Sequence, residues 1–279
     1  STMGNTIIRL LEPDNGEIIF EGHDLAKMIR HELRKYRADI QMIFQDPFSS
    51  LDPRMHVFDI IAEPLRVHHT VSGKELEDRV LNLMEVVGLD ASYAQRYPHE
   101  FSGGQRQRIG IARALALQPK LVICDEPVSA LDVSIQAQIL NLLEELKEKM
   151  QLTYIFIAHG LPSVKYISDR IAVMYLGRIV ELADTKELFA HPLHPYTQGL
   201  LQAIPIPDPN LRKSDAERAI MGGDIPNAMK PPEGCYFHPR CPYATADCCN
   251  ESVGGPPILT EVRPGHFVSC FHAKEFAEK

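Results

Sequence analysis

Two segments of the chain carry residue types that bind and hydrolyse phosphates. The first, 102–105 (Ser-Gly-Gly-Gln), precedes a stretch with helical periodicity, so its glycines are expected at a helix N-terminus, where free N–H groups bind phosphate oxygens. The second is the short apolar run 121–124, which ends in Asp125 and Glu126. A buried parallel strand presents polar residues in this way at the sheet edge where α/β folds bind ligands. An aspartate there can hold Mg²⁺, and an adjacent glutamate can deprotonate an attacking water.

Two other polar residues follow apolar runs in the same way. Gln45 follows the run 40–43 through Phe44, and His159 follows the run 153–158. Taken singly, each of these motifs also occurs in ordinary turns and strand ends. Their joint occurrence, in the order Phe-Gln-Asp-Pro, Phe-Ser-Gly-Gly-Gln, Asp-Glu-Pro and Ala-His, resembles the ATP-hydrolysing subunits of ABC transporters.

The resemblance implies a fold, two cofactors and a set of roles. The fold is α/β, with a P-loop NTPase (RecA-like) core, an inserted α-helical subdomain and an irregular C-terminal extension. ATP and Mg²⁺ are the implied cofactors, with Asp125 and Gln45 in the metal shell. Glu126 is expected to act as the general base, and His159 to steady the γ-phosphate and the attacking water.

The glycine-containing segment is expected to work on a different nucleotide. In the family that the chain resembles, two ATPase subunits pair head to tail around two nucleotides. Ser102, Gly103, Gly104 and Gln105 would then contact the nucleotide held by the opposite subunit, and Asp132 would lie at the seam of the dimer.

The first residues resemble the end of a phosphate-binding loop. Such ATPases need a glycine-rich loop that ends in Gly-Lys-Ser/Thr, and no such loop occurs in this sequence. The chain opens with Ser1 and Thr2 and runs into a periodic apolar stretch, 7–11, which resembles the helix after that loop. Ser1 is therefore expected to bind Mg²⁺ and Thr2 to contact phosphate, with the rest of the loop missing upstream. A simple helix cap is the alternative, and a chain without the loop is expected to bind ATP poorly.

Periodicity and turn residues divide the chain into four expected parts. They are a first part of the nucleotide-binding core (1–52), a helical subdomain with the Ser-Gly-Gly motif (53–115), a second part of the core (116–204) and the C-terminal extension (205–279). Prolines at 205, 207 and 209 contribute to the last boundary.

Several elements within these parts can be predicted. Strands are expected over 16–22 and 40–44, and a hairpin over 171–175 and 178–182. A helix is expected to begin at a capping box formed by Ser72 and Glu75 and to end at Gly88. A strongly amphipathic helix is expected over 135–150, with a packing role.

Composition narrows the class of protein. The 279 residues are 44% hydrophobic and 24% charged, which is ordinary for a globular protein of more than one domain. No apolar run reaches the length of a membrane span, so membrane association is expected through partners. A net charge of −8 makes nucleic acid an unexpected partner.

Most of the cysteines lie in a Pro- and Gly-rich segment near the C-terminus. The stretch 234–244 resembles the C-terminal extension of oligopeptide and dipeptide importer ATPases, some of which carry a [4Fe–4S] cluster. Zinc and free thiols are the alternatives, since the cysteine spacing is wider than in most zinc sites. Cys249 is then a spare thiol, and Cys124 a buried strand residue. The expected cluster ligands are Cys235, Cys241, Cys248 and Cys270.

The segments 46–53 and 194–207 resemble the same peptide and nickel importer branch. The implied partners are a second ABC ATPase subunit, either a copy or a paralogue, two transmembrane permeases and, indirectly, a substrate-binding protein. The implied location is the cytoplasmic face of the cell membrane, with peptides as the expected substrate class. Two other functions remain open: a non-transport ABC ATPase, and a catalytically inactive interaction module.

Overall fold

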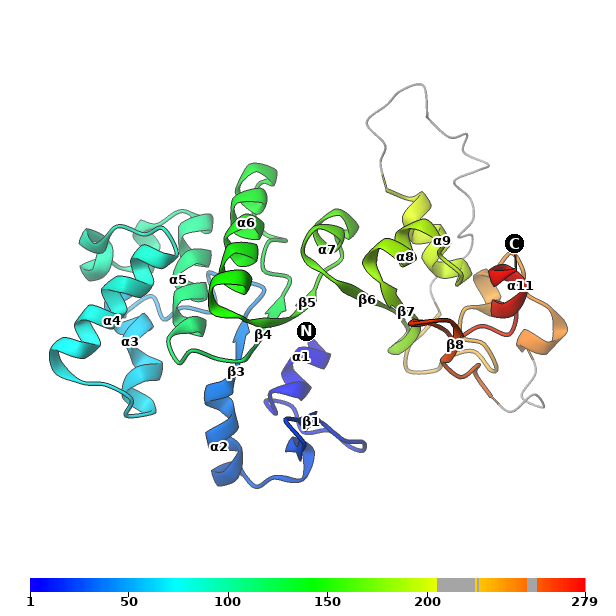
Figure 1. The fold of residues 1–279 in the computed structure, drawn as a ribbon, viewed down its shortest axis with the longest axis horizontal. Coiled ribbons are helices and arrows are strands. Elements are labelled where there is room, and N and C mark those ends of the chain that lie inside the picture. Colours follow the sequence, from blue (N-terminus) through cyan, green and yellow to red (C-terminus); the bar gives the residue numbers. More distant parts are fainter. Residues whose placement is uncertain (205–223, 225, 250–254, 279) are drawn as a thin grey trace. The chain divides into compact units, whose positions relative to one another are not determined.

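The computed structural model describes residues 1–204, 224, 226–249 and 255–278 (Figure 1). They form two compact units, Ser1–Ile167 and Ser168–Lys279. Pro205, Pro207 and Pro209, which mark the expected start of the extension, lie outside the described residues. The division into four parts therefore stays a prediction.

A three-stranded parallel sheet forms the centre of the first unit, as the α/β prediction requires. Its strands are β3 (Ile40–Ile43), β4 (Leu121–Asp125) and β5 (Thr153–Ile157), in the order β3-β4-β5. In register, Ile43 pairs with Cys124 and Asp125 pairs with Ile157. The carboxyl ends of all three strands therefore meet at one edge of the sheet.

The predicted strand over 16–22 is wrong in extent, because a turn interrupts it. Only β1 (Ile19–Phe20) forms, and it pairs with β2 (His23–Asp24) across a two-residue loop. Both loop residues, Glu21 (φ 48) and Gly22 (φ 80), take left-handed conformations, as a type I′ hairpin turn demands. The sequence Glu-Gly is a less obvious signal for this turn than Asn-Gly.

The helix predicted at the start of the chain also ends early. Helix α1 spans Thr2–Ile7, and Arg9 then turns into the left-handed region with φ 56. The guanidinium of Arg9 donates to the backbone oxygens of Leu25 and Ala26. These contacts fold the chain back on the segment that leads into α2. The neighbouring elements are η1 (Leu25–Lys27) and α2 (Arg30–Asp39).

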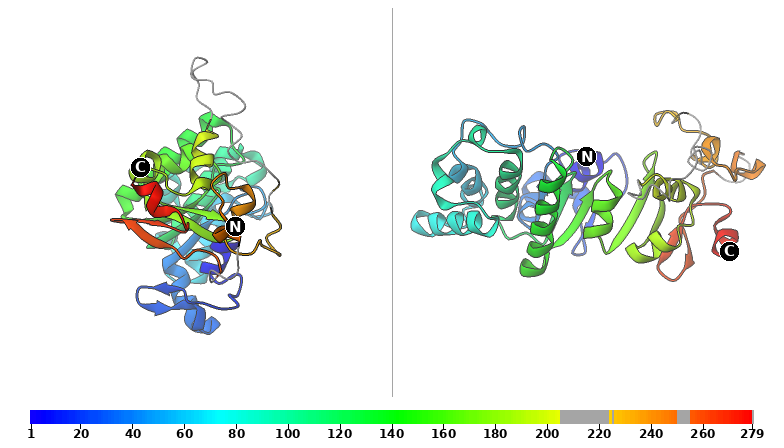
Figure 2. Two further views of the ribbon diagram at one scale, coloured as in Figure 1. Left: turned by 90° about the vertical axis from the view of Figure 1, so that its right-hand side faces the viewer. Right: turned by 90° about the horizontal axis from the view of Figure 1, so that it is seen from above.

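Three helices and two short 3₁₀ turns make up the helical region of the first unit (Figures 1 and 2). The helices are α3 (Val57–Val67), α4 (Gly73–Val86) and α5 (Gly103–Leu115), and the turns are η2 (Ala91–Gln95) and η3 (Pro98–Glu100). The predicted capping box at Ser72 is wrong, because its side chain makes no cap hydrogen bond. Gly73, the first residue of the helix, has φ 58 and is therefore left-handed. This conformation differs from the one in which a serine side chain caps the first turn of a helix.

The predicted amphipathic helix is α6 (Val133–Met150), and its apolar face packs into the core. Ile139 and Leu143 on that face are fully buried. The helix ends where Gln151 takes the left-handed conformation. A short helix, α7 (Leu161–Ile167), completes the first unit.

An antiparallel sheet organises the second unit. Its strands are β6 (Arg170–Tyr175), β7 (Arg178–Asp184), β8 (Thr260–Arg263) and β9 (His266–Val268), in the order β6-β7-β9-β8. The predicted hairpin is β6–β7. The extension expected to be irregular thus supplies two strands. It also contains short helices at α11 (Ala273–Ala277), η6 (His238–Arg240) and η7 (Ala246–Cys249), while α8 (Thr185–Ala190) and α9 (Pro195–Gln202) precede it. Across the described residues, no helix is both long and apolar enough to traverse a membrane.

Candidate active site

Glu126 lies at the centre of the polar side chains gathered at the sheet edge. It directly follows β4, and its backbone N–H donates to the oxygen of Ile157 on the adjacent strand. One carboxylate oxygen, Oε2, accepts a hydrogen bond of 2.9 Å from Nε2 of Gln45. The other, Oε1, lies 2.9 Å from Nε2 of His159. The three residues that sequence analysis places after separate strands are therefore in direct contact.

The backbone at Glu126 is strained. Its φ of 47 lies in the left-handed region, which favours glycine and costs other residues on the order of 1 kcal/mol or more. Only 9% of the residue is exposed. The hydroxyl of Ser129 donates to the backbone oxygen of Glu126, which helps to hold this turn. The kink directs the carboxylate at the edge of the sheet, toward Gln45 and His159.

Asp125, the last residue of β4, is suited to hold a cation. It is 3% exposed, and its Oδ1 is buried without a hydrogen-bond partner. The backbone nitrogen of Ser1 lies 3.3 Å from this oxygen, so Ser1 is adjacent to Asp125. Ser1 precedes α1, yet its hydroxyl caps no N–H, so the cap alternative receives no support. An orphaned, buried carboxylate oxygen beside a hydroxyl residue matches the donor set that Mg²⁺ prefers.

The Ser-Gly-Gly segment forms a different local structure. Ser102 and Gln105 form a reciprocal capping box, in which Ser102 N donates to Gln105 Oε1 (3.1 Å) and Gln105 N donates to Ser102 Oγ (3.4 Å). Sequence analysis missed this box, although Ser-x-x-Gln is its signature. The glycines lie at the start of α5, as predicted.

The two glycines also permit close packing. A Cβ on Gly104 would lie 2.5 Å from Cγ2 of Ile135, and one on Gly103 would lie 3.2 Å from Cδ2 of Leu131. Helix α6 and the turn before it therefore approach α5 at a distance that only glycine allows. Asp132, between those two contacts in sequence, is exposed and its side chain caps no N–H of α6.

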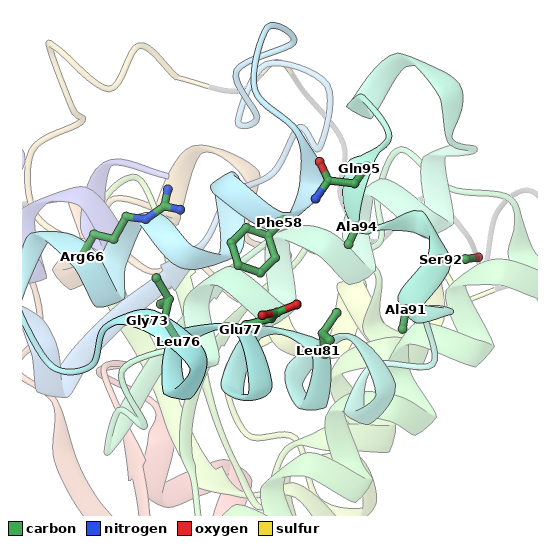
Figure 3. A pocket seen from close by; sticks show the side chains of 10 residues that line it. All are labelled: Phe58, Arg66, Gly73, Leu76, Glu77, Leu81, Ala91, Ser92, Ala94 and Gln95. Carbon is green, nitrogen blue, oxygen red and sulfur yellow. The ribbon is translucent and has the colours of Figure 1, made fainter.

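A pocket of about 680 Å³ opens in the helical region, between α3, α4 and η2 (Figure 3). Its apolar lining includes Phe58, Leu76 and Leu81, and Arg66 and Glu77 supply charge. None of the predicted nucleotide-binding residues lines it. The pocket is therefore a candidate for binding something other than the nucleotide.

Three of the four predicted cluster cysteines, Cys235, Cys241 and Cys270, have raised pKa values in the second unit. The pKa of Cys235 is raised to about 11 and that of Cys270 to about 12, chiefly by burial and in smaller part by the charge that neighbouring thiols would carry. Burial likewise raises the pKa of Cys241, with a contribution from Cys248. Yet no three His, Cys, Asp or Glu side chains among the described residues are placed to hold a metal ion.

Two residues near this group escaped sequence analysis. Sγ of Cys248 lies 3.6 Å from Nε2 of His272 and 3.6 Å from Oγ1 of Thr245. Nothing in the spacing of these residues signals the contact. Cys124 is buried, as predicted, and Cys249, the expected spare thiol, is exposed.

Comparison with known proteins bears on both units. A family described as "ABC transporter" matches residues 1–129, and one described as "Oligopeptide/dipeptide transporter, C-terminal region" matches residues 180–248. The chain is 52% identical over 274 residues to the oligopeptide transport ATP-binding protein AppF of Bacillus subtilis (strain 168). This alignment covers 97% of this chain and 81% of that protein. It is 52% identical over 271 residues to the oligopeptide transport ATP-binding protein OppF of Salmonella typhimurium, with 97% and 79% covered.

A solved structure shares the fold. The dimeric, post-hydrolysis structure of the ATP-binding cassette MJ0796 bound to ADP and Pi aligns with a TM-score of 0.60 at 30% identity. The alignment covers 66% of this chain and 79% of that one.

Proposed function

Since the chain belongs to the ABC transporter family of ATP-binding proteins, in its oligopeptide-transport branch, we propose that it hydrolyses ATP to drive peptide import through a membrane permease. One observation carries the chemical part of this proposal. The carboxylate of Glu126 is held between Gln45 and His159, and the preceding residue, Asp125, has a buried carboxylate oxygen without a hydrogen-bond partner. Few arrangements other than a hydrolytic phosphate site need these four groups together.

Each side chain has a role in hydrolysis. Oδ1 of Asp125 would hold Mg²⁺ together with the hydroxyl of Ser1, and bound Mg²⁺ would neutralise charge on the phosphates. Glu126 would take the proton of the attacking water. Because the amide nitrogen of Gln45 donates to Glu126, its oxygen is available to the metal shell. His159, whose side chain is 91% exposed, would turn its ring toward the γ-phosphate.

Removing the base tests this assignment. In a transporter assembled with a full-length form that carries the phosphate-binding loop, Glu126→Gln should keep ATP binding and lower ATP turnover at least ~100-fold, since the amide cannot accept the proton. Glu85→Gln, an exposed glutamate of α4, is the matched control and should hydrolyse normally. Unchanged turnover in Glu126→Gln would remove Glu126 from the base role.

The remaining nucleotide contacts would come from a second subunit. We propose that Ser102, Gly103, Gly104 and Gln105 contact the partner's nucleotide, that Thr2 contacts phosphate of its own, and that Asp132 lies at the seam. Support comes from the dimeric form of the cassette MJ0796 and from the local hydrogen bonds of the segment, which use the N–H groups of Ser102 and Gln105 and leave those of Gly103 and Gly104 available. The second subunit is either a copy of this chain or a paralogue.

The permease is proposed to dock on the helical region. The pocket between α3, α4 and η2 has an apolar lining with Arg66 and Glu77 at hand, which suits an amphipathic helix (Figure 3). This docking would place the chain at the cytoplasmic face of the membrane, with a substrate-binding protein acting through the permease. Leu81→Glu should abolish co-purification with the permeases and leave ATP binding intact.

The cysteine group is proposed to hold a [4Fe–4S] cluster through Cys235, Cys241, Cys248 and Cys270. Support comes from the proximity of the thiols: burial raises the pKa of Cys235, Cys241 and Cys270, and the charges that neighbouring cysteines would carry add to each of these three shifts. Zinc sites usually place two cysteines two to four residues apart, and the wider sequence spacing of these cysteines suits zinc less well. Iron and sulfide analysis of anaerobically purified protein tests the proposal: a colourless, iron-free preparation would refute it.

A further inference from the structure

The sulfur of Cys248 has two polar side chains within hydrogen-bonding distance. Oγ1 of Thr245 and Nε2 of His272 each lie 3.6 Å from Sγ of Cys248. These two atoms are also 3.2 Å from each other. Because Cys248 is 5% exposed, little solvent competes with the two side chains for its sulfur. The three groups therefore form a closed triangle of hydrogen-bond partners at one of the proposed cluster ligands.

The other three proposed ligands receive their hydrogen bonds from the main chain. Burial raises the pKa of each of these thiols, and a hydrogen bond from the backbone N–H group two residues further along the chain lowers it. Such donors are present whatever the side chain at that position. Thiol and donor pair as Cys235 with Phe237, Cys241 with Tyr243, and Cys270 with His272.

The main chain fixes the position of the Thr245 hydroxyl next to the sulfur. The backbone N–H of Cys248 donates to the oxygen of Thr245 over 3.0 Å, which closes a turn between the two residues. The backbone oxygen of Cys248 in turn accepts from the N–H of Cys235 over 2.9 Å. The hydroxyl of Thr245 has no hydrogen-bond partner among the described residues other than Cys248 and His272. Removing this hydroxyl therefore changes only the group around the sulfur.

His272 reaches the same sulfur from a part of the sequence 24 positions away, just before α11. Its side chain is 18% exposed. Its other ring nitrogen, Nδ1, lies 3.4 Å from Oε1 of Glu275, whose side chain is 70% exposed. The contact of the ring with Cys248 is therefore better shielded from water than its contact with Glu275.

These contacts matter most for a sulfur that binds iron. A thiolate carries no hydrogen and can only accept, so the Thr245 hydroxyl and a hydrogen on Nε2 of His272 would both serve as donors. A hydrogen bond to a charged acceptor is roughly twice as strong as one between neutral groups. Hydrogen bonds to ligand sulfurs are among the factors that set the reduction potential of an iron–sulfur cluster. They raise it, because they stabilise the more negative, reduced state.

We propose that Thr245 and His272 are positioning residues of the cysteine group, which donate hydrogen bonds to the sulfur of Cys248 and raise the reduction potential of the cluster that it would bind. This inference rests on the proposed [4Fe–4S] cluster. The sulfurs of Cys235, Cys241 and Cys270 accept from fixed main-chain groups, whereas the donors at Cys248 can be substituted.

The midpoint potential of anaerobically purified, iron-loaded full-length protein tests the proposal. It is measured by titration with dithionite, followed by electron paramagnetic resonance. Thr245→Val, which keeps the shape of the side chain, should shift the equilibrium about three- to tenfold toward the oxidised state, a fall of ~30–60 mV for one electron. Thr245→Ser, which keeps the hydroxyl, should shift it less than about twofold.

Variants of His272 provide an independent measurement at the same sulfur. His272→Leu should lower the potential in the same direction, and His272→Gln, which keeps an N–H donor, should restore at least half of the loss. Because His272→Leu also removes the contact with Glu275, Glu275→Ala is the matched control. Since this glutamate is mostly exposed, Glu275→Ala should shift the equilibrium less than about twofold.

The failure of this inference can be told apart from failure of the proposed cluster. Unchanged potentials in both Thr245→Val and His272→Leu, in protein with the iron content of one cluster per chain, would overturn the inference and leave the cluster standing. An iron-free wild type would refute both. Should Thr245→Val fail to retain iron, full loading of Thr245→Ser would support the donor role, and iron loss from both would contradict it.

Discussion

The first unit and the second unit position their polar side chains by different means. At the sheet edge of the first unit, parallel strands in register deliver Gln45, Asp125 and His159 to one place. In the second unit, fully buried Glu181 on β7 is held by side-chain contacts, above all by His266, with 2.8 Å between Glu181 Oε1 and His266 Nε2. A side chain placed by strand register should keep its position when a neighbouring side chain is removed. A side chain placed by contacts with other side chains should lose its position when one of those partners is removed.

The largest expected effect is the loss of Glu181. Its carboxylate accepts hydrogen bonds from the backbone N–H groups of Leu193 (2.7 Å) and His194 (3.1 Å), besides facing His266. Glu181→Leu should lower the free energy of unfolding of the second unit by about 3–5 kcal/mol, because buried donors lose their acceptor. Chemical denaturation followed by circular dichroism measures it.

An exposed pair in the same unit supplies the contrast. His191 lies 3.1 Å from Glu187, and its side chain is 57% exposed. His191→Ala should cost less than about 1 kcal/mol. Equal losses in Glu181→Leu and His191→Ala would remove the distinction between buried mutual contact and surface pairing.

The next effect tests the close approach of α5 and α6 in the first unit. Gly104→Ala places a methyl group against Ile135 and should destabilise that unit by about 1–3 kcal/mol. Gly110→Ala, in the same helix, meets no atom within 4 Å and should stabilise it by about 0.5–1 kcal/mol. Thermal unfolding of both variants tests this prediction. A change in melting temperature of the same sign in both variants would contradict the packing role of Gly104.

A smaller effect is expected at the capping box. Ser102→Ala should cost about 1 kcal/mol of stability, since the N–H of Gln105 loses its acceptor. Ser72→Ala should cost close to nothing, because Ser72 caps no N–H. A comparable loss in Ser72→Ala would show that its cap forms in solution.

The last prediction concerns pH. Burial alone would lower the pKa of His266, but its hydrogen bonds with Glu181 and Glu187 and their charges raise it above the ordinary value. Protonation of His266 therefore stabilises the fold fully below about pH 6.5, and this contribution is lost as pH rises through the folded pKa. The stability difference between the wild type and His266→Gln should shrink from pH 6 to pH 9 in urea titrations, and a constant difference would contradict it.

Two other groups in the same network titrate in the opposite sense. Burial lowers the pKa of His194 to about 4. The contribution of neutral His194 to the free energy of unfolding is therefore present above about pH 6.5 and declines as the pH falls. The pKa of Glu187 is lowered chiefly by its hydrogen bond with His191, with a smaller share from Arg263 and His266, so its contribution is lost in acid. Both groups remain in His266→Gln, so comparing the two proteins cancels their titration, apart from the small share of the Glu187 shift that His266 itself supplies.

The contrast between units also explains what the sequence could predict. Gln45, Glu126 and His159 each follow an apolar run, and the geometry of a parallel sheet then brings them together. Glu181 looks like an exposed charge that interrupts an apolar strand. Its partner His266 is separated from it by 85 positions, and no local pattern links the two. The hairpin turn at Glu21 and the left-handed conformation of Gly73 at the start of α4 were not predicted. Both depend on positive φ angles, and the residue type alone does not determine whether a position takes one.

The strained backbone of Glu126 implies a trade-off between thermal stability and ATP turnover. A residue without a side chain would relax the φ of 47 at no steric cost, so Glu126→Gly should relieve local strain while abolishing hydrolysis. Variants selected for heat resistance alone would accumulate glycine or asparagine at this position. Only a selection that also demands ATP turnover would retain the glutamate there.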